Sequence, residues 1–267
     1  MKTIPQNLRN ALALLLLMAA SPALHADTYT NPDSGLVLQY TISNGEATVT
    51  GGTVPSDGKL VIPETLGGVT VVTIGESAFN SNPHVKEVSA KSVTRVEKYA
   101  FSLSQTVTTI HLPKVVHIED GSFTRCVDLL TVSLPEATSI GDEAFYDCVS
   151  LRRLCLPKVT SIGNQAFSQC PLAKLSIPKA ATIGNHAFYG GGHATLTTVS
   201  LPGTVSIGNF AFGDCTDLES VFMPKVRSIG ERAFYYCSAL TGVYLGGKPT
   251  LGANSFRNAP ADLTIHH

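Results

Sequence analysis

One phenylalanine returns through most of the chain at a nearly constant interval. Most steps between successive copies are 22 residues, and the two exceptions are 21 and 24 residues. The series is Phe79, Phe101, Phe123, Phe145, Phe167, Phe188, Phe212, Phe234 and Phe256. A fixed period of this length indicates a solenoid, in which each coil contacts only its neighbours. Added length then adds coils to a rod rather than building a second globular core.

The residues around this phenylalanine form a unit that recurs with few changes. In one coil, Leu154 and Leu156 lie two apart, so both point to the same side of a strand. Pro157 ends that strand because it has no N–H to donate to a ladder. Gly163 follows a second inward residue, and we expect it to supply a positive φ or a close approach. We expect the Ala-Phe pair to form a short helical turn, and we expect the phenylalanine ring to fill the interior.

The first 26 residues have a different composition. Lys2 and Arg9 precede an apolar run over residues 11–20, and small residues follow it. This layout predicts a secretory signal peptide, because the run is too short to span a bilayer. We expect cleavage after Ala26, with Ala23 as the alternative. No later stretch is apolar enough for a transmembrane helix, so we expect an exported protein that is secreted, periplasmic or at the cell surface.

Residues 27–58 do not carry the repeat. Two segments with alternating apolar residues flank Asn44-Gly45, a dipeptide that favours positive φ at both centres of a hairpin turn. Because a solenoid needs a different end piece over its first coil, we interpret this segment as an N-terminal β-hairpin cap. The alternative is a disordered leader. Residues 59–267 then form the solenoid, with about nine coils.

The full unit runs from Cys148 through Leu151, Leu154 and Leu156-Pro157 to Ile162-Gly163 and Ala166-Phe167. It resembles the BspA-like, or treponemal-type, leucine-rich repeat, and the resemblance covers about residues 60 to 265. That family implies a leucine-rich-repeat solenoid: a right-handed superhelix with a parallel β-sheet on one face and short strands or helical turns on the other. It also implies a secreted or surface protein. Some members take part in adhesion to host matrix proteins and in co-aggregation, which implies a binding role without assigning it to any residue.

The outward strand positions define a candidate recognition surface. The central position of each strand reads Ser89, His111, Ser133, Cys155, Ser176, Ser200, Phe222 and Tyr244. Exposed aromatic side chains on a rigid face are typical binding anchors. We therefore expect a partner to bind at Phe222 and Tyr244, with Arg153 and Lys174 from the neighbouring column. The alternative is that the two aromatic residues form a cross-strand pair that stabilises the sheet, or are covered by a loop.

A basic column follows the strand proline. It contains Lys114, Lys158, Lys179 and Lys225, and it is broken by Glu136 and Gly203. We interpret it as a solvated loop edge that keeps the rod soluble. The alternative is a ridge that binds acidic glycans or anionic surfaces.

Five of the six cysteines share one repeat position: Cys126, Cys148, Cys170, Cys215 and Cys237. We expect a ladder of buried free thiols, because parallel stacking holds the Cβ atoms too far apart for disulfides. Disulfides in an exported protein are the alternative.

Cys155 should point outward beside serines, which are not bases, so we expect no catalytic thiol. We expect no metal site or cofactor, since no Cys-x-x-Cys pattern occurs. The terminal His266-His267 pair leaves open a metal contact or a solvated end.

The charge balance, with 19 basic and 20 acidic residues, is unlike that of a nucleic-acid binder. No nucleophile–base pair, paired carboxylates or phosphate loop recurs in register, which argues against an enzyme. The sequence therefore favours a secreted or surface-associated binding or adhesion module. Its partner would be a protein or glycan, such as host matrix proteins or molecules on neighbouring cells. The alternative is a structural repeat protein that self-associates through its C-terminal coil, with an enzyme third.

Overall fold

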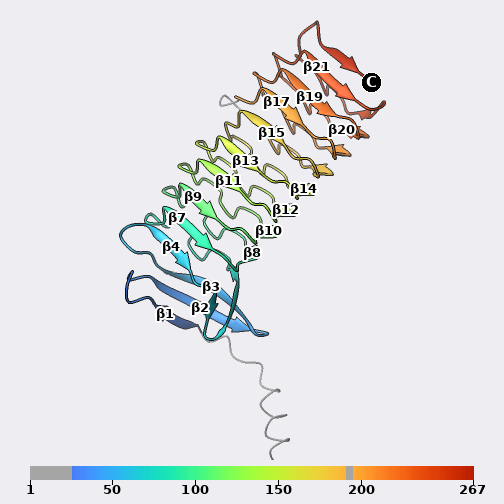
Figure 1. The fold of residues 1–267 in the computed structure, drawn as a ribbon. Helices are drawn as coiled ribbons and strands as arrows, with labels where there is room; N and C mark the ends of the chain where they lie inside the picture. The colour runs from blue at the N-terminus through green and yellow to red at the C-terminus, as the bar shows by residue number, and fades with distance from the viewer. Residues whose placement is uncertain (1–25, 191–194) are drawn as a thin grey trace, which may run out of the picture.

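The computed structural model describes residues 26–190 and 195–267, and Figure 1 shows them as a rod of stacked coils. The expected signal peptide over residues 1–26 lies outside the described residues except for Ala26. Every regular element in the described ranges is a β-strand. The N-terminal elements are β1 (Asp27–Thr30), β2 (Val37–Ser43), β3 (Glu46–Thr53), β4 (Lys59–Ile62), β5 (Thr65–Leu66) and β6 (Val69–Ile74).

Each later coil adds one longer and one shorter strand, on opposite sides of the rod (Figure 1). The longer strands are β7 (Glu87–Ala90), β9 (Thr109–His111), β11 (Thr131–Ser133), β13 (Arg153–Cys155), β15 (Lys174–Ser176), β17 (Thr198–Ser200), β19 (Ser220–Met223), β21 (Gly242–Leu245) and β23 (Thr264–His266). The shorter strands are β8 (Arg95–Val96), β10 (His117–Ile118), β12 (Ser139–Ile140), β14 (Ser161–Ile162), β16 (Thr182–Ile183), β18 (Ser206–Ile207), β20 (Ser228–Ile229) and β22 (Thr250–Leu251).

The coils stack by parallel pairing. The short strands form one continuous ladder from β6 to β22. The longer strands form two sheets that part between β13 and β15. The break lies where the segment between Cys170 and Leu172 is one residue shorter than the matching segment between Cys148 and Leu151. The architecture confirms the predicted leucine-rich-repeat solenoid.

The hairpin is present at the N-terminal end. β2 and β3 pair antiparallel around Asn44 and Gly45, whose φ values are 53° and 78°. These are the positive values that the dipeptide predicted. β3 continues the ladder by pairing parallel with β6, and the hairpin buries Leu38 and Val49. The hairpin thus extends the ladder of the coils at the N-terminal end of the rod.

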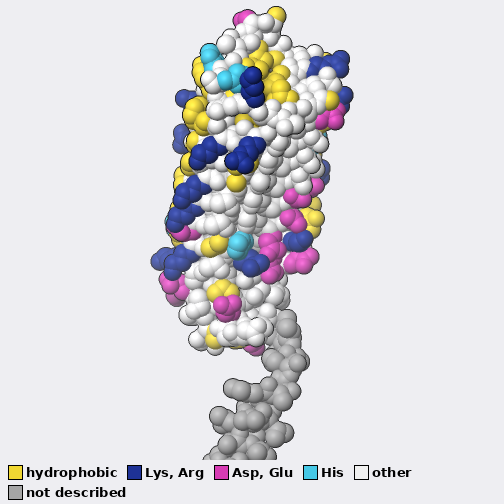
Figure 2. Space-filling view, turned by 90° about the vertical axis from the view of Figure 1, so that its right-hand side faces the viewer, with side chains coloured by type: hydrophobic (Ala, Val, Ile, Leu, Met, Phe, Trp, Pro, Cys, Tyr) yellow, Lys and Arg dark blue, Asp and Glu magenta, His cyan; other side chains and the backbone are white. Residues whose placement is uncertain are grey.

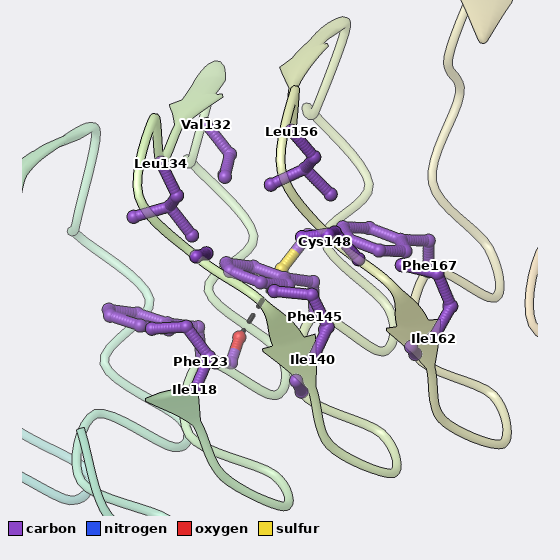
Figure 3. Close-up of a cluster of buried hydrophobic side chains, with 14 of the residues drawn as sticks. Ile118, Phe123, Val132, Leu134, Ile140, Phe145, Cys148, Leu156, Ile162 and Phe167 are labelled. Atoms are coloured by element: carbon purple, nitrogen blue, oxygen red, sulfur yellow. Dashed lines mark hydrogen bonds between the residues drawn. The ribbon is translucent and has the colours of Figure 1, made fainter. Parts of the chain in front are cut away.

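The repeated phenylalanines form a continuous spine inside the rod. All nine rings stack, with neighbouring centroids 5.1–5.4 Å apart and planes within 11° of parallel. Figure 3 shows Phe123, Phe145 and Phe167 in one row, between leucines that directly follow the longer strands and the isoleucines of the shorter ones. Offset stacking at this separation is a favourable arrangement for aromatic rings. The row of rings confirms the inward assignment made from the repeat.

The Ala-Phe pair lies in a turn, so the predicted helical turn is wrong. Gln165 and Gln169 bracket the pair of Ala166 and Phe167, and both have left-handed backbone, with φ of 54° and 65°. Only three residues lie between these two, too few for a helix, and the segment is a turn. The backbone instead bonds to the next coil: Phe167 donates its N–H to the carbonyl of Ala187 at 2.8 Å.

The repeated glycine is required by a close approach rather than by its φ. A Cβ on Gly163 would lie 2.5 Å from the carbonyl carbon of Gly141 and 2.6 Å from Oδ1 of Asp142. The same carboxylate oxygen accepts the N–H of Asn164 at 2.7 Å. Because a side chain from the preceding coil lies directly against the glycine, any larger residue would push the coils apart.

Candidate functional site

The structure exposes all four residues predicted to bind a partner. Arg153 begins β13 and Lys174 begins β15, while Phe222 and Tyr244 are central in β19 and β21. The exposed fractions of Phe222 and Tyr244 are 46% and 43%. The four residues belong to the outward columns of the longer strands, which we call the long-strand face. They form a basic pair, Arg153 and Lys174, and an aromatic pair, Phe222 and Tyr244. The strand β17, whose outward side chains are small hydroxyls, lies between the two pairs.

The aromatic pair extends to a third residue that sequence reasoning missed. Phe222 is in register with Tyr244, and Tyr244 is in register with His266 on β23. The rings of Tyr244 and His266 stack at 4.5 Å and 7°. Tyr244 also lies over Gly242, where a Cβ would be 3.3 Å from its ring. We call Phe222, Tyr244 and His266 the aromatic row. Continuing the outward column in the sequence as far as β23 would have placed His266 in it.

A second aromatic group lies at the turn after the short strands. The rings of His186 and Phe210 stack at 4.9 Å and 9°, and the Arg232 guanidinium lies 5.5 Å from the Phe210 centroid. These three residues occupy one repeat position, which has positive φ in each coil. Bulky residues rarely adopt that backbone, and the stack compensates for part of its cost. The sequence did contain a signal for this stack, because the position changes from Glu143 and Gln165 in earlier coils to His, Phe and Arg in the next three.

The ladder of free thiols is confirmed, with four of its five members buried and Cys170 half-buried. All six cysteines are free. Each of the five in the shared position donates its thiol hydrogen to the carbonyl of a spine phenylalanine, at 3.1–3.3 Å. Burial raises the pKa of Cys215, and it raises the pKa of Cys237 to about 12. These thiols therefore stay protonated and poorly nucleophilic at neutral pH. Cys155 is exposed on the long-strand face, in register with Ser133.

The short-strand face, made of the outward residues of β8 to β22, carries a shallow hollow of about 560 Å³. His117 Nδ1 lies 2.9 Å from the hydroxyl of Ser139. The Glu119 carboxylate is 2.8 Å from the Arg95 guanidinium. Figure 2 shows basic, acidic and histidine side chains gathered together in the lower half of this face. Because the carboxylate already has a cationic partner, this group is a polar surface held by ion pairs.

A second ion pair lies beside the same hollow. Lys98 Nζ and Asp120 Oδ2 are 2.8 Å apart. Their hydrogen bond is the main cause of a raised pKa for Lys98 and a lowered pKa for Asp120. Both groups thus stay charged over a wide pH range, as suits a solvated structural contact.

Within residues 26–190 and 195–267, no group of three or more His, Cys, Asp or Glu residues is arranged to hold a metal ion. In the same ranges, no helix is long and apolar enough to cross a membrane.

The comparisons with known proteins agree with the geometry. A family model described as the BspA type leucine rich repeat region matches six copies over residues 72–193 and 138–261. No curated protein matches the chain. Among solved structures, the pneumococcal vaccine antigen PcpA is similar at 17% identity and a TM-score of 0.51, over 90% of this chain and 89% of the other.

Two further solved structures are leucine-rich-repeat proteins. The T. pallidum leucine rich repeat protein is 23% identical, with a TM-score of 0.45, over 91% of this chain and 92% of the other. A leucine rich cell surface protein from Faecalibacterium prausnitzii is 20% identical, with a TM-score of 0.42, over 86% and 97%. The repeat, the stacked spine and the family match, which spans most of the chain, lead to one conclusion: this protein belongs to the BspA type leucine-rich-repeat family.

Proposed function

We propose that this protein is an exported binding or adhesion module that recognises a protein partner through its long-strand face. The aromatic row carries the proposal. Phe222 and Tyr244 are both more than two-fifths exposed on a rigid sheet, and His266 extends them. Solvent-exposed aromatic side chains in register offer a large contact area with little entropy to lose on binding.

The other half of the face supplies a different kind of contact. Arg153 and Lys174 are exposed at the starts of β13 and β15. Between these cations and the aromatic row lies β17, with the hydroxyls of Thr198 and Ser200. A partner that spans this distance would place an apolar group on the aromatic row and an acidic group near the cations. The combination favours a protein over a neutral glycan.

Export and surface location belong to the same proposal. They are supported by residues 1–26, which have the layout of a secretory signal peptide. An exported rod with a flat, polar and partly aromatic face suits adhesion to matrix proteins or to neighbouring cells.

The test is a binding survey of the purified protein against matrix proteins and a glycan panel. Phe222→Ala/Tyr244→Ala should weaken binding to the recognised protein by at least ten-fold, about 1.4 kcal/mol. Ser133→Ala/Ser176→Ala, on the same face, is the matched control and should bind like wild type. Equal binding by the aromatic variant and wild type would remove this surface from the proposal.

A second candidate function is self-association through the last two strands. Leu251 on β22 and Ile265 on β23 are 50% and 37% exposed, whereas their counterparts Ile229 and Val243 are buried. β22 and β23 are edge strands of their sheets. Such edges pair readily with another copy. Light scattering should show a dimer that Leu251→Lys/Ile265→Lys converts to monomer, and a wild-type monomer would exclude this function.

A further inference from the structure

Charge is distributed unevenly along the rod. Residues 59–150 contain seven Lys and Arg against eleven Asp and Glu, whereas residues 151–250 contain nine against four. The nearly neutral total therefore hides an acidic N-terminal half and a basic C-terminal half. A field of one sign over several coils attracts ligands of the opposite sign.

Five of these cations lie along one edge of the rod, between the longer and the shorter strands. They are Lys158, Lys179, Lys225, Arg227 and Lys248, which we call the basic edge. All are exposed. Figure 2 shows Lys and Arg side chains following one another up one edge of the short-strand face. Since neighbouring coils are about 4.8 Å apart, Lys158 and Lys179 are about one such step apart, and Lys225 lies two steps further on.

Most of the basic edge is electrostatically unpaired. Lys158 is 2.6 Å from Glu136. In the described part of the chain, no carboxylate oxygen lies within 4.0 Å of the charged nitrogens of Lys179, Lys225, Arg227 or Lys248. Arg95 and Lys98, in the acidic half, both have carboxylate partners. The cations of the basic edge are thus available to a ligand.

A hollow lies within the basic edge. It measures about 410 Å³ and is lined by Val205, Pro224, Lys225, Val226, Arg227, Gly246, Gly247 and Lys248. Three of these residues are cations and none is acidic. One wall of the hollow is closely packed backbone: at Gly246 a Cβ would lie 2.1 Å from the Pro224 carbonyl oxygen, so only glycine fits. Val205, 39% exposed, adds an apolar wall.

We propose that the basic edge is a binding site for a linear acidic polysaccharide, with carboxylate or sulfate groups spaced along its chain. Cations placed in a line, one or two coils apart, match a linear polyanion. The apolar wall formed by Val205 and Pro224 suits the C–H faces of sugar rings, while Lys225, Arg227 and Lys248 neutralise the acidic substituents.

Two other anionic partners fit the geometry less well. A membrane presents a plane, whereas the basic edge is a line that is narrow across the rod. Single-stranded nucleic acids need aromatic platforms for base stacking beside the cations. The eight residues that line the hollow include no aromatic side chain.

The experiment measures binding of the purified protein to heparin, which is sulfated and carboxylated, to hyaluronate, which is carboxylated, and to uncharged dextran. The wild type should bind the two acidic polysaccharides, should bind less well as salt rises, and should ignore dextran. Lys225→Gln/Arg227→Gln/Lys248→Gln should weaken binding roughly ten-fold. The control Lys59→Gln/Lys86→Gln/Lys91→Gln removes the same charge from the acidic half and should change binding by less than about two-fold.

Several results would overturn the inference. These are equal weakening by both triple variants, binding of dextran, no binding of either acidic polysaccharide, and tighter binding of phosphatidylglycerol vesicles or single-stranded DNA. The Phe222→Ala/Tyr244→Ala variant should bind heparin like wild type. Loss of partner binding in that variant thus tests the proposed function, and loss of polysaccharide binding in the basic triple variant tests the basic edge.

Discussion

The thiol of Cys148 donates a hydrogen bond to the backbone carbonyl of Phe123, 25 residues earlier, with Sγ and oxygen 3.3 Å apart (Figure 3). The bond ties the end of one coil to the spine position of the coil before it. Four other cysteines repeat the contact, and Ser104 makes it with its hydroxyl to Phe79 at 2.6 Å. In these six coils the position holds a small side chain that carries a donor.

Replacing Cys148 tests this requirement. Cys148→Ala removes the donor and creates a small void, and it leaves the Phe123 carbonyl with only the N–H of Cys126, at 3.2 Å. We therefore expect a loss of about 1–2 kcal/mol in the free energy of unfolding. Cys148→Ser should cost less, because Ser104 shows that a hydroxyl fits the same position. Urea unfolding measures both variants, with Cys155→Ala as the surface control. An alanine variant as stable as the serine variant would contradict the role of the bond.

Thiol labelling separates the exposed cysteine from the ladder. In the folded protein at pH 8, Cys155 should react first with a thiol reagent, because it is exposed. Cys126, Cys215 and Cys237 should react only on unfolding, because burial raises the pKa of each thiol. Unfolded protein should give six thiols, and Cys155→Ser should lose the fast phase. A count of two or fewer in the unfolded protein would show disulfides.

Two glycines form a matched pair for a packing test. Gly163→Ala would place its Cβ 2.5 Å from the backbone of Gly141, and we expect a loss of about 2 kcal/mol or more. Gly247→Ala meets nothing within 4 Å and should stay within about 0.5 kcal/mol of wild type. Thermal unfolding compares the two variants. Similar losses in both would mean that backbone flexibility, rather than coil contact, explains the repeated glycine.

The phenol of Tyr189 gives a pH-dependent prediction. Its hydroxyl donates to the Asp214 carboxylate, and this bond raises the pKa of Tyr189 from 10.0 to about 12. Because the folded pKa is the higher one, the stability from this bond is complete below pH 10 and is lost as pH rises toward 12. The stability difference between wild type and Tyr189→Phe should therefore shrink over that window. Asp214→Asn should bring the tyrosine titration back toward pH 10, measured by tyrosinate absorbance; an unchanged titration would exclude the carboxylate as the cause.

Only part of the candidate site could be predicted from the sequence. Alternation along a strand was enough to place Arg153, Lys174, Phe222 and Tyr244 on one exposed face. It did not show that Tyr244 lies over Gly242 and stacks on His266, because both contacts depend on how the ring turns and on which strand follows. The stack of His186, Phe210 and Arg232 was missed for the same reason.

By itself, the sequence determined the period, the inward residues, the spine of phenylalanines, the thiol ladder and the hairpin around Asn44-Gly45. Each of these follows from local chemistry repeated once per coil. Only the tertiary structure decided why Gly163 must be glycine, which position within each coil has positive φ, and which cations of the basic edge lack a carboxylate partner. Those facts depend on contacts between coils, and a side chain's neighbour in the next coil is set by the stacking register and the rotamer rather than by adjacent residues in the chain.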